Sequence, residues 1–106
     1  MSIPETYLQT SWGDSFDDVT IEDVQSAIEE LTETEGEDAV FWVGIFVGDS
    51  EIVLESRKNL TVLGIFNDPE EEEIEAQFDN WTEIEALYEI FLTKDFEQVQ
   101  SVLKAK

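Results

Sequence analysis

The chain has 106 residues, of which 27 are Asp or Glu and only 5 are Lys or Arg, and it contains neither His nor Cys. Its formal net charge of −22 repels nucleic acids, nucleotides and anionic membranes and attracts basic surfaces. The lack of His and Cys removes the usual general base, the thiolate nucleophile and the preferred transition-metal ligands. We therefore expect a non-enzymatic binding protein for a basic protein, with no cofactor, no metal site and no direct contact to nucleic acid or membrane.

A single acidic domain spanning residues 1–106 is expected from the chain length and from a hydrophobic content of 42%. The sequence contains no run of 18 apolar residues, so we predict no membrane-spanning helix. The first residues, MSIPETYLQTSW, have neither the positive charge nor the apolar core of a signal peptide. The expected location is therefore the cytoplasm.

The acidic residues are concentrated towards the two ends of the chain. Residues 1–38 carry a net charge of −12, residues 39–67 carry −1, and residues 68–106 carry −9. The middle segment is nearly neutral and rich in apolar residues, which predicts that it forms the core. The flanking segments carry most of the negative field.

One strand and one helix are predicted before the neutral segment. Residues 7–12 form an expected strand that ends at Gly13. A helix follows, with Thr20 as its N-cap and Asp23 in the reciprocal capping position, and its apolar residues recur at helical spacing. Residues 35–38 are expected to end this helix.

The neutral segment predicts an antiparallel meander of strands over residues 40–47, 51–56 and 60–66, separated by turn signals. Residues 70–79 are ambiguous, because Asp68 and Pro69 resemble a helix start. Ile74, Ala76 and Phe78, however, alternate with polar residues as in a half-exposed strand. We predict a further strand here, since the alternation extends through the segment.

Two helices are expected to complete the chain. Thr82 is the predicted cap of the first helix, with Glu85 in the capping-box position and Trp81 just before the helix, and the second begins at about Asp95. The prediction is an α+β fold in the order β-α-β-β-β-β-α-α. It has an antiparallel four- to five-stranded meander sheet with the helices packed on one face.

The central strands are apolar on both faces, although helices cover only one face of such a sheet. The second face is therefore either covered by the N-terminal segment or free to contact a partner or a second copy, so a homodimer through this face stays open. Gly44 and Gly64 indicate that something bulky approaches the sheet closely. Trp42, between apolar neighbours, is expected to pack in the core.

Two acid-rich segments are the predicted contact sites for a basic partner, although such segments are also typical of solvated loops. A calcium loop counted from Asp14 is excluded, because Phe16, Val19 and Gln25 occupy positions that require other residue types. An exposed Trp12 beside acidic residues would suit an anchor for a basic surface. The predicted partner-binding residues are Trp12, Asp14, Asp17, Asp18 and Glu22 in the first segment and Glu70, Glu71, Glu72 and Glu73 in the second.

Three segments together resemble the small acidic immunity proteins of bacterial polymorphic toxin systems. They are TIEDVQSAIEEL, VFWVGIFVGDSEIVLESRKNLTVLGIF and WTEIEALYEIFL. The resemblance lies in the order of elements and in the charge, and it covers most of the chain. It implies a cytoplasmic antidote that binds and blocks a toxin domain, often a nuclease or deaminase with a basic active-site groove.

Two other classes of function fit the composition. A DNA mimic uses carboxylates in place of phosphates to occupy a nucleic-acid-binding protein. A structural or assembly domain would carry the same charge for solubility alone.

Overall fold

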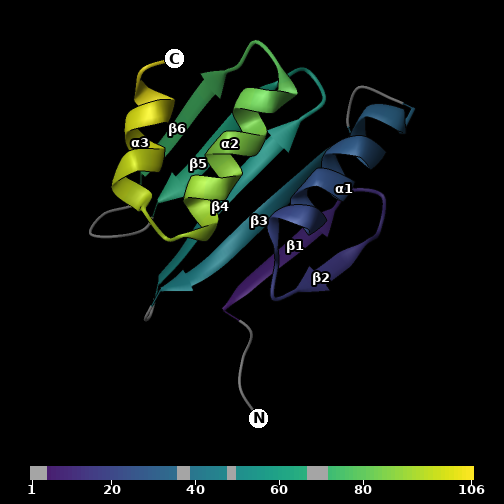
Figure 1. Cartoon of the computed structure of the whole chain (residues 1–106), viewed down its shortest axis with the longest axis horizontal. Coiled ribbons are helices and arrows are strands. Elements are labelled where there is room, and N and C mark those ends of the chain that lie inside the picture. The colour runs from purple at the N-terminus through teal and green to yellow at the C-terminus, as the bar shows by residue number, and fades with distance from the viewer. Residues whose placement is uncertain (1–4, 36–38, 48–49, 67–71) are drawn as a thin grey trace.

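The protein folds around one six-stranded antiparallel sheet with three helices, as described by a computed structural model for residues 5–35, 39–47, 50–66 and 72–106 (Figure 1). The strands are β1 (Thr6–Thr10), β2 (Ser15–Asp17), β3 (Val40–Val47), β4 (Ser50–Arg57), β5 (Thr61–Phe66) and β6 (Glu72–Gln77). The helices are α1 (Ile21–Glu33), α2 (Trp81–Leu92) and α3 (Phe96–Lys104). The strand order across the sheet is β2-β1-β3-β4-β5-β6. The α+β class and the β3–β6 meander are confirmed.

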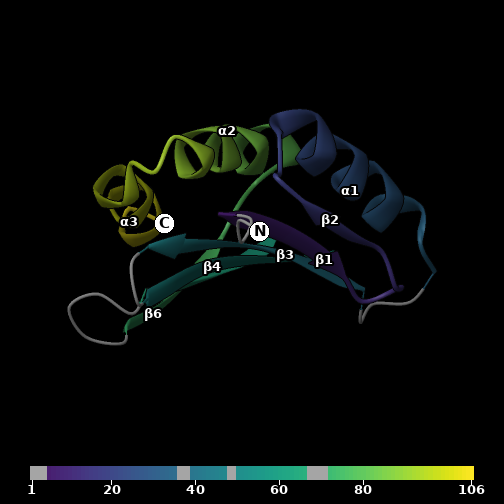
Figure 2. The same cartoon turned by 90° about the horizontal axis from the view of Figure 1, so that it is seen from below.

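All three helices cover the same face of the sheet, and the opposite face carries no helix (Figure 2). Helix α1 contacts β1 and β3, α3 contacts β6, and α2 contacts both other helices. In the described part of the chain, no helix combines the length and apolar character needed to cross a bilayer. The predicted packing of the helices on one face is therefore confirmed.

The core lies between the helices and the sheet and is built from alternate strand residues. Phe41, Val43 and Ile45 of β3 point towards the helices and are fully buried, as the two-residue period of a strand requires. Opposite them lie the apolar stripes of the helices. The buried helical residues are Val24, Ala27, Ile28, Leu31, Ile84, Leu87, Tyr88, Phe91, Val99 and Leu103.

Gly64 of β5 allows α3 to approach the sheet. A Cβ atom at this position would lie 2.7 Å from Cδ1 of Leu103 and 2.7 Å from the ring of Phe66. The bulky neighbour expected beside this glycine is therefore the protein's own core.

The N-terminal region contains a strand that the sequence did not predict. Strand β2 is only three residues long, and it pairs with β1 so that Asp17 lies opposite Tyr7. The preceding strand ends at Thr10 rather than at Trp12. Its end is the β1–β2 turn, where the amide of Asp14 donates to the hydroxyl of Thr10 at 2.8 Å. The sheet thus has six strands instead of four or five.

The first helix begins as predicted, and the second begins two residues earlier. Thr20 and Asp23 form the expected capping box of α1. In α2 the cap is Asn80, whose side-chain oxygen accepts from the amide of Glu83 at 2.9 Å. The prediction of Thr82 as cap is wrong, because Asn80 has the extended backbone of an N-cap residue and asparagine is a better N-cap than threonine. Trp81 is consequently the first residue inside the helix.

Some expected features fall on residues that the structure does not describe. Helix α1 ends at Glu33, and of the predicted stop at residues 35–38 all but Glu35 lies outside the described residues. The same holds for residues 48–49 of the first meander turn and for the loop at residues 67–71, which includes Glu70 and Glu71. Residues 72–77 form the predicted strand.

Candidate partner-binding face

The face of the sheet opposite the helices, called the open face here, has an apolar centre. Cross-strand register places Tyr7, Gly44, Val53 and Ile65 in one row across β1, β3, β4 and β5. The neighbouring row contains Gln9, Trp42, Glu55 and Leu63. The apolar centre of the open face consists of Tyr7, Trp42, Phe46, Val53, Leu63 and Ile65.

The side chains of this centre are accessible to solvent. Phe46 is 41% exposed, and the other five are half-buried. The expectation that Trp42 packs in the core is wrong, because its position in β3 points away from the helices while Phe41 and Val43 point towards them. The residues of β3 that point to either face of the sheet are apolar, so the sequence alone did not distinguish the covered face from the open one.

Tyr7 lies flat across the sheet over Gly44. A Cβ atom on Gly44 would fall 2.3–2.6 Å from the ring carbons and hydroxyl oxygen of Tyr7, so only glycine leaves room for the ring. The Tyr7 ring also packs against Phe46, with ring centroids 5.6 Å apart. Burial raises the pKa of Tyr7 to about 12, helped by the charge of Glu51 and a hydrogen bond to its carboxylate. The N-terminal strand therefore covers part of this face with one aromatic ring.

Carboxylates surround and penetrate the apolar centre. By their register, the acidic residues of the open face are Asp17, Glu51, Glu55, Glu73 and Glu75. Glu55 stands among the apolar side chains with 25% of its side chain exposed, and its Oε2 lies 3.8 Å from Nη2 of Arg57. Among the residues that the structure describes on this face, Arg57 is the single base. The face is therefore apolar in the middle and strongly negative around it.

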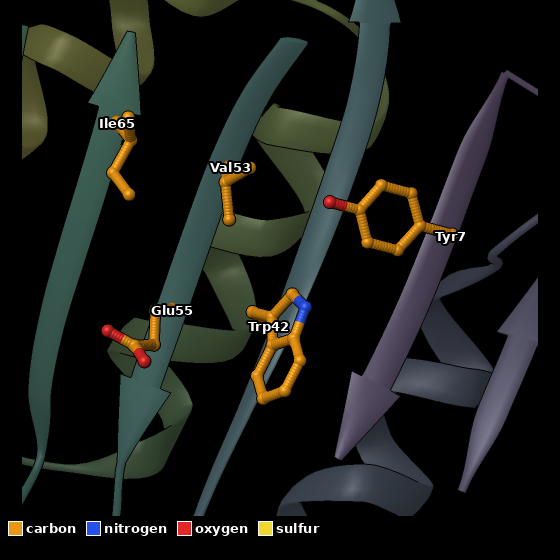
Figure 3. A pocket seen from close by; sticks show the side chains of 5 residues that line it. All are labelled: Tyr7, Trp42, Val53, Glu55 and Ile65. Atoms are coloured by element: carbon orange, nitrogen blue, oxygen red, sulfur yellow. The ribbon is translucent and has the colours of Figure 1, made fainter. Parts of the chain in front are cut away.

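A depression of about 280 Å³ lies at the centre of the open face (Figure 3). Its walls are Tyr7 of β1, Trp42 of β3, Val53 and Glu55 of β4, and Ile65 of β5. In Figure 3 the hydroxyl of Tyr7 points towards β3, and Trp42 and Glu55 lie side by side on neighbouring strands. The depression combines two aromatic rings, two aliphatic side chains and one carboxylate.

The first predicted contact segment lies at the β2 edge of the sheet. Trp12 is half-buried and packs against the core, and its Nε1 donates to Oδ2 of Asp14 at 3.0 Å. Asp18 and Glu22 are exposed near the start of α1. Asp17, opposite Tyr7, is the member of this segment that belongs to the open face.

The second predicted segment lies at the opposite edge, on β6. Glu72 is placed on the helix side, where its Oε1 lies 3.4 Å from Nζ of Lys104. Glu73 lies opposite Ile65 on the open face. Since β2 and β6 are the two outer strands, the predicted segments do not meet in one site. The register places Asp17 and Glu73 on the open face, one at each end of it.

Sequence reasoning missed the residues between these two ends. Tyr7, Phe46 and Glu55 were not among the predicted contact residues, although the two-sided apolar pattern of the central strands indicated such a surface. Within the described residues, no three acidic side chains are grouped so that they would hold a metal ion. Comparison of the chain with protein-family models, with curated proteins and with solved structures gave no match.

Proposed function

We propose that this chain is an acidic binding protein that docks a basic protein on the open face and blocks it. The open face is the single observation that supports this proposal. Contiguous exposed apolar side chains rimmed by polar residues are typical of protein–protein contact sites. Here the rim is acidic, so the complementary surface carries Lys or Arg around an apolar centre.

The class of partner follows from the resemblance to immunity proteins together with the charge. A toxin domain of the nuclease or deaminase type must attract nucleic acid, and its active-site groove is therefore basic. An acidic face laid on that groove excludes the substrate. We place this inhibition in the cytoplasm, where such a toxin would act on the cell that makes the antidote.

The apolar centre separates this proposal from the alternatives. A DNA mimic needs carboxylates where phosphates would lie, whereas the middle of the open face carries aromatic and aliphatic side chains. Charge that served only solubility would not require these side chains to be accessible. A homodimer through the face would bring two acidic rims together, and like charges opposite one another oppose association.

The chain offers a matched pair of positions for testing the proposed face. Phe46 is 41% exposed on the open face, and Phe16 is 40% exposed on β2, opposite Leu8 on the helix side of the sheet. The photo-crosslinking residue p-benzoylphenylalanine is placed at each position in turn in the cells that produce the protein. We expect a basic protein to be captured from position 46 and not from position 16, and purified wild-type protein to inhibit the captured protein's activity.

The purified complex then gives the quantitative test. Truncating an anchoring aromatic residue typically costs about 2 kcal/mol, so Phe46→Ser should weaken binding about thirtyfold, whereas Phe16→Ser should leave it nearly unchanged. Capture from position 16 alone, capture of an acidic protein, or self-capture at position 46 would each overturn the proposal.

A further inference from the structure

We propose that the central depression of the open face receives the side chain of an arginine from the partner. This inference rests on the proposed function and identifies the group that the face recognises. The depression has a volume of about 280 Å³, which lies just below the range of about 300–1,000 Å³ that holds drug-sized ligands. Its size therefore suits a single long side chain inserted from a docked protein.

The walls supply the contacts that a guanidinium group prefers. Trp42 offers an indole ring, the aromatic surface that attracts cations most strongly. Glu55 is the direct cross-strand neighbour of Trp42, so one planar cation can stack on the ring while it donates two hydrogen bonds to the carboxylate. Val53 and Ile65 are positioned to contact the methylene stem, as apolar surfaces do for long basic side chains.

The position of Glu55 favours a cation over a neutral ligand. Three quarters of its side-chain surface is covered, and its neighbours Trp42, Val53 and Leu63 are apolar. A half-buried carboxylate in such surroundings is stabilised by an opposite charge. Among the described residues, Arg57 is the basic residue paired with Glu55, with 3.8 Å between its Nη2 and Oε2 of Glu55. The side chain of Arg57 is 57% exposed. Because this contact is long and Arg57 is largely exposed to solvent, the pair is weak, and a second guanidinium can displace it.

Tyr7 keeps the depression in shape. Its ring is held over Gly44 and its hydroxyl bonds to the carboxylate of Glu51, so this wall is already in place before a partner arrives. A preformed wall reduces the ordering cost of binding. Two planar rings and a carboxylate in the lining fit the flat guanidinium group better than the tetrahedral ammonium group of lysine.

The inference is tested with small probes on the full chain, without a protein partner. The probes are N-acetyl-arginine amide, its neutral isostere N-acetyl-citrulline amide, and N-acetyl-lysine amide. The readout is the NMR signal of the indole N–H groups, because Trp42 lines the depression while Trp12 and Trp81 pack elsewhere and act as internal controls. We expect the arginine probe to shift the Trp42 signal saturably, with a dissociation constant on the order of millimolar, and to leave the other two unchanged.

Because citrulline has no positive charge, it cannot form charge-assisted contacts with Glu55. The citrulline probe should therefore bind at least about tenfold more weakly than the arginine probe. Glu55→Gln should abolish the shift caused by the arginine probe. Glu75→Gln removes the same charge from the same face but does not line the depression, and it should change the affinity less than about twofold. Arg57→Gln removes the competing internal cation and should strengthen binding of the probe.

Equal shifts at all three indoles, equal binding of the citrulline probe, or an unchanged affinity in Glu55→Gln would overturn the inference. Tighter binding of the lysine probe would overturn the assignment to arginine. These outcomes are separable from the proposed function. A basic protein captured at position 46 without any response to the arginine probe refutes only the arginine site, whereas probe binding without such capture refutes the docked partner.

Discussion

At the scale of single residues, Tyr88 shows how a polar group is accommodated in the core. Its side chain is fully buried, and its hydroxyl lies 2.6 Å from Oγ of Ser56 and donates to the carbonyl of Leu54 at 3.2 Å. Burial raises the pKa of this hydroxyl far above its usual range. In the described residues no buried side-chain polar atom is left without a partner. This contact ties helix α2 to strand β4 through one hydrogen-bonded group.

Tyr88→Phe should lower the free energy of unfolding by about 1–3 kcal/mol, because it leaves the buried hydroxyl of Ser56 without its partner. The measurement is urea unfolding followed by tryptophan fluorescence. Adding Ser56→Ala to this variant should restore part of the loss, since neither hydroxyl is then unpaired. A Tyr88→Phe protein as stable as the wild type would show that the contact contributes nothing.

Tyr7 provides a second prediction, which concerns alkaline pH. Because its pKa is raised from 10.0 to about 12, the folded protein should form little tyrosinate between these two pH values, whereas the unfolded chain should ionise near 10. The stabilisation that this shift contributes is complete below pH 10 and is lost as the pH rises through about 12. Absorbance of tyrosinate in native and urea-unfolded samples measures the difference.

Glu51→Gln is the control for this titration, because it removes the charge and the charged hydrogen-bond acceptor beside Tyr7. It should lower the pKa of Tyr7 towards its ordinary value while Tyr88 stays protonated. If Tyr7 ionises at the same pH in native and unfolded samples, its ring is not packed over Gly44.

At the scale of secondary-structure elements, each helix begins at a side chain that accepts a backbone N–H. The caps are Thr20 for α1, Asn80 for α2 and Asp95 for α3. All three helices lie on one face of the sheet, so their starting positions decide which side chains enter the core. Starting α2 at Trp81 places Ile84, Leu87 and Tyr88 towards the sheet.

Asn80→Ala should destabilise the protein by about 1 kcal/mol, because the amide of Glu83 loses its acceptor. Thr82→Ala is the matched control: Thr82 is exposed inside the helix, and its replacement should change stability by less than about 0.5 kcal/mol. Urea unfolding of both variants compares the two positions. A larger loss for Thr82→Ala would favour the cap that the sequence alone predicts.

At the scale of the whole molecule, negative charge dominates. Against a net charge of −22, the described residues form four ion pairs, and all of them are at least partly exposed. Exposed pairs of this kind contribute about 0–1 kcal/mol each. Repulsion among the remaining carboxylates should therefore reduce the stability of the fold at low ionic strength.

Salt should consequently stabilise the protein. At 0.15 M ionic strength the Debye length falls to about 8 Å, so repulsion between distant carboxylates is largely screened. For a domain of this size, each 1 kcal/mol of relieved repulsion raises the melting temperature by about 4–8 °C. Thermal unfolding at low and at physiological NaCl concentration measures the gain. A melting temperature that falls on adding NaCl would contradict the dominance of repulsion.

A variant of α1 serves as the control for the salt effect. Glu29, Glu30 and Glu33 are exposed, and the latter two lie in the last turn of the helix, where negative charge opposes the helix dipole. Replacing all three by Gln should raise the melting temperature at low salt and reduce the further gain on adding NaCl.

The sequence by itself determined the parts of this protein that depend on local chemistry. The α+β class, the meander and the strand at residues 72–77 follow from two-residue alternation, since neighbouring strand residues point to opposite faces. The start of α1 follows from Thr20 and Asp23, which are three residues apart. The negative field follows from composition alone.

Only the tertiary structure decided which face of the sheet stays open and what gathers on it. Strand β1 pairs with β3, although the whole of α1 lies between these strands in the chain. Strand β2 pairs with β1 through only three residues, which have no apolar pattern. The β1–β3 pairing joins residues that are distant in the chain, so no local sequence signal indicates it, and the β2 residues lack the alternation that would predict a strand. The strand pairings bring Tyr7 over Gly44 and set Trp42 beside Glu55, because register across strands, and not spacing along one strand, determines which side chains share a surface.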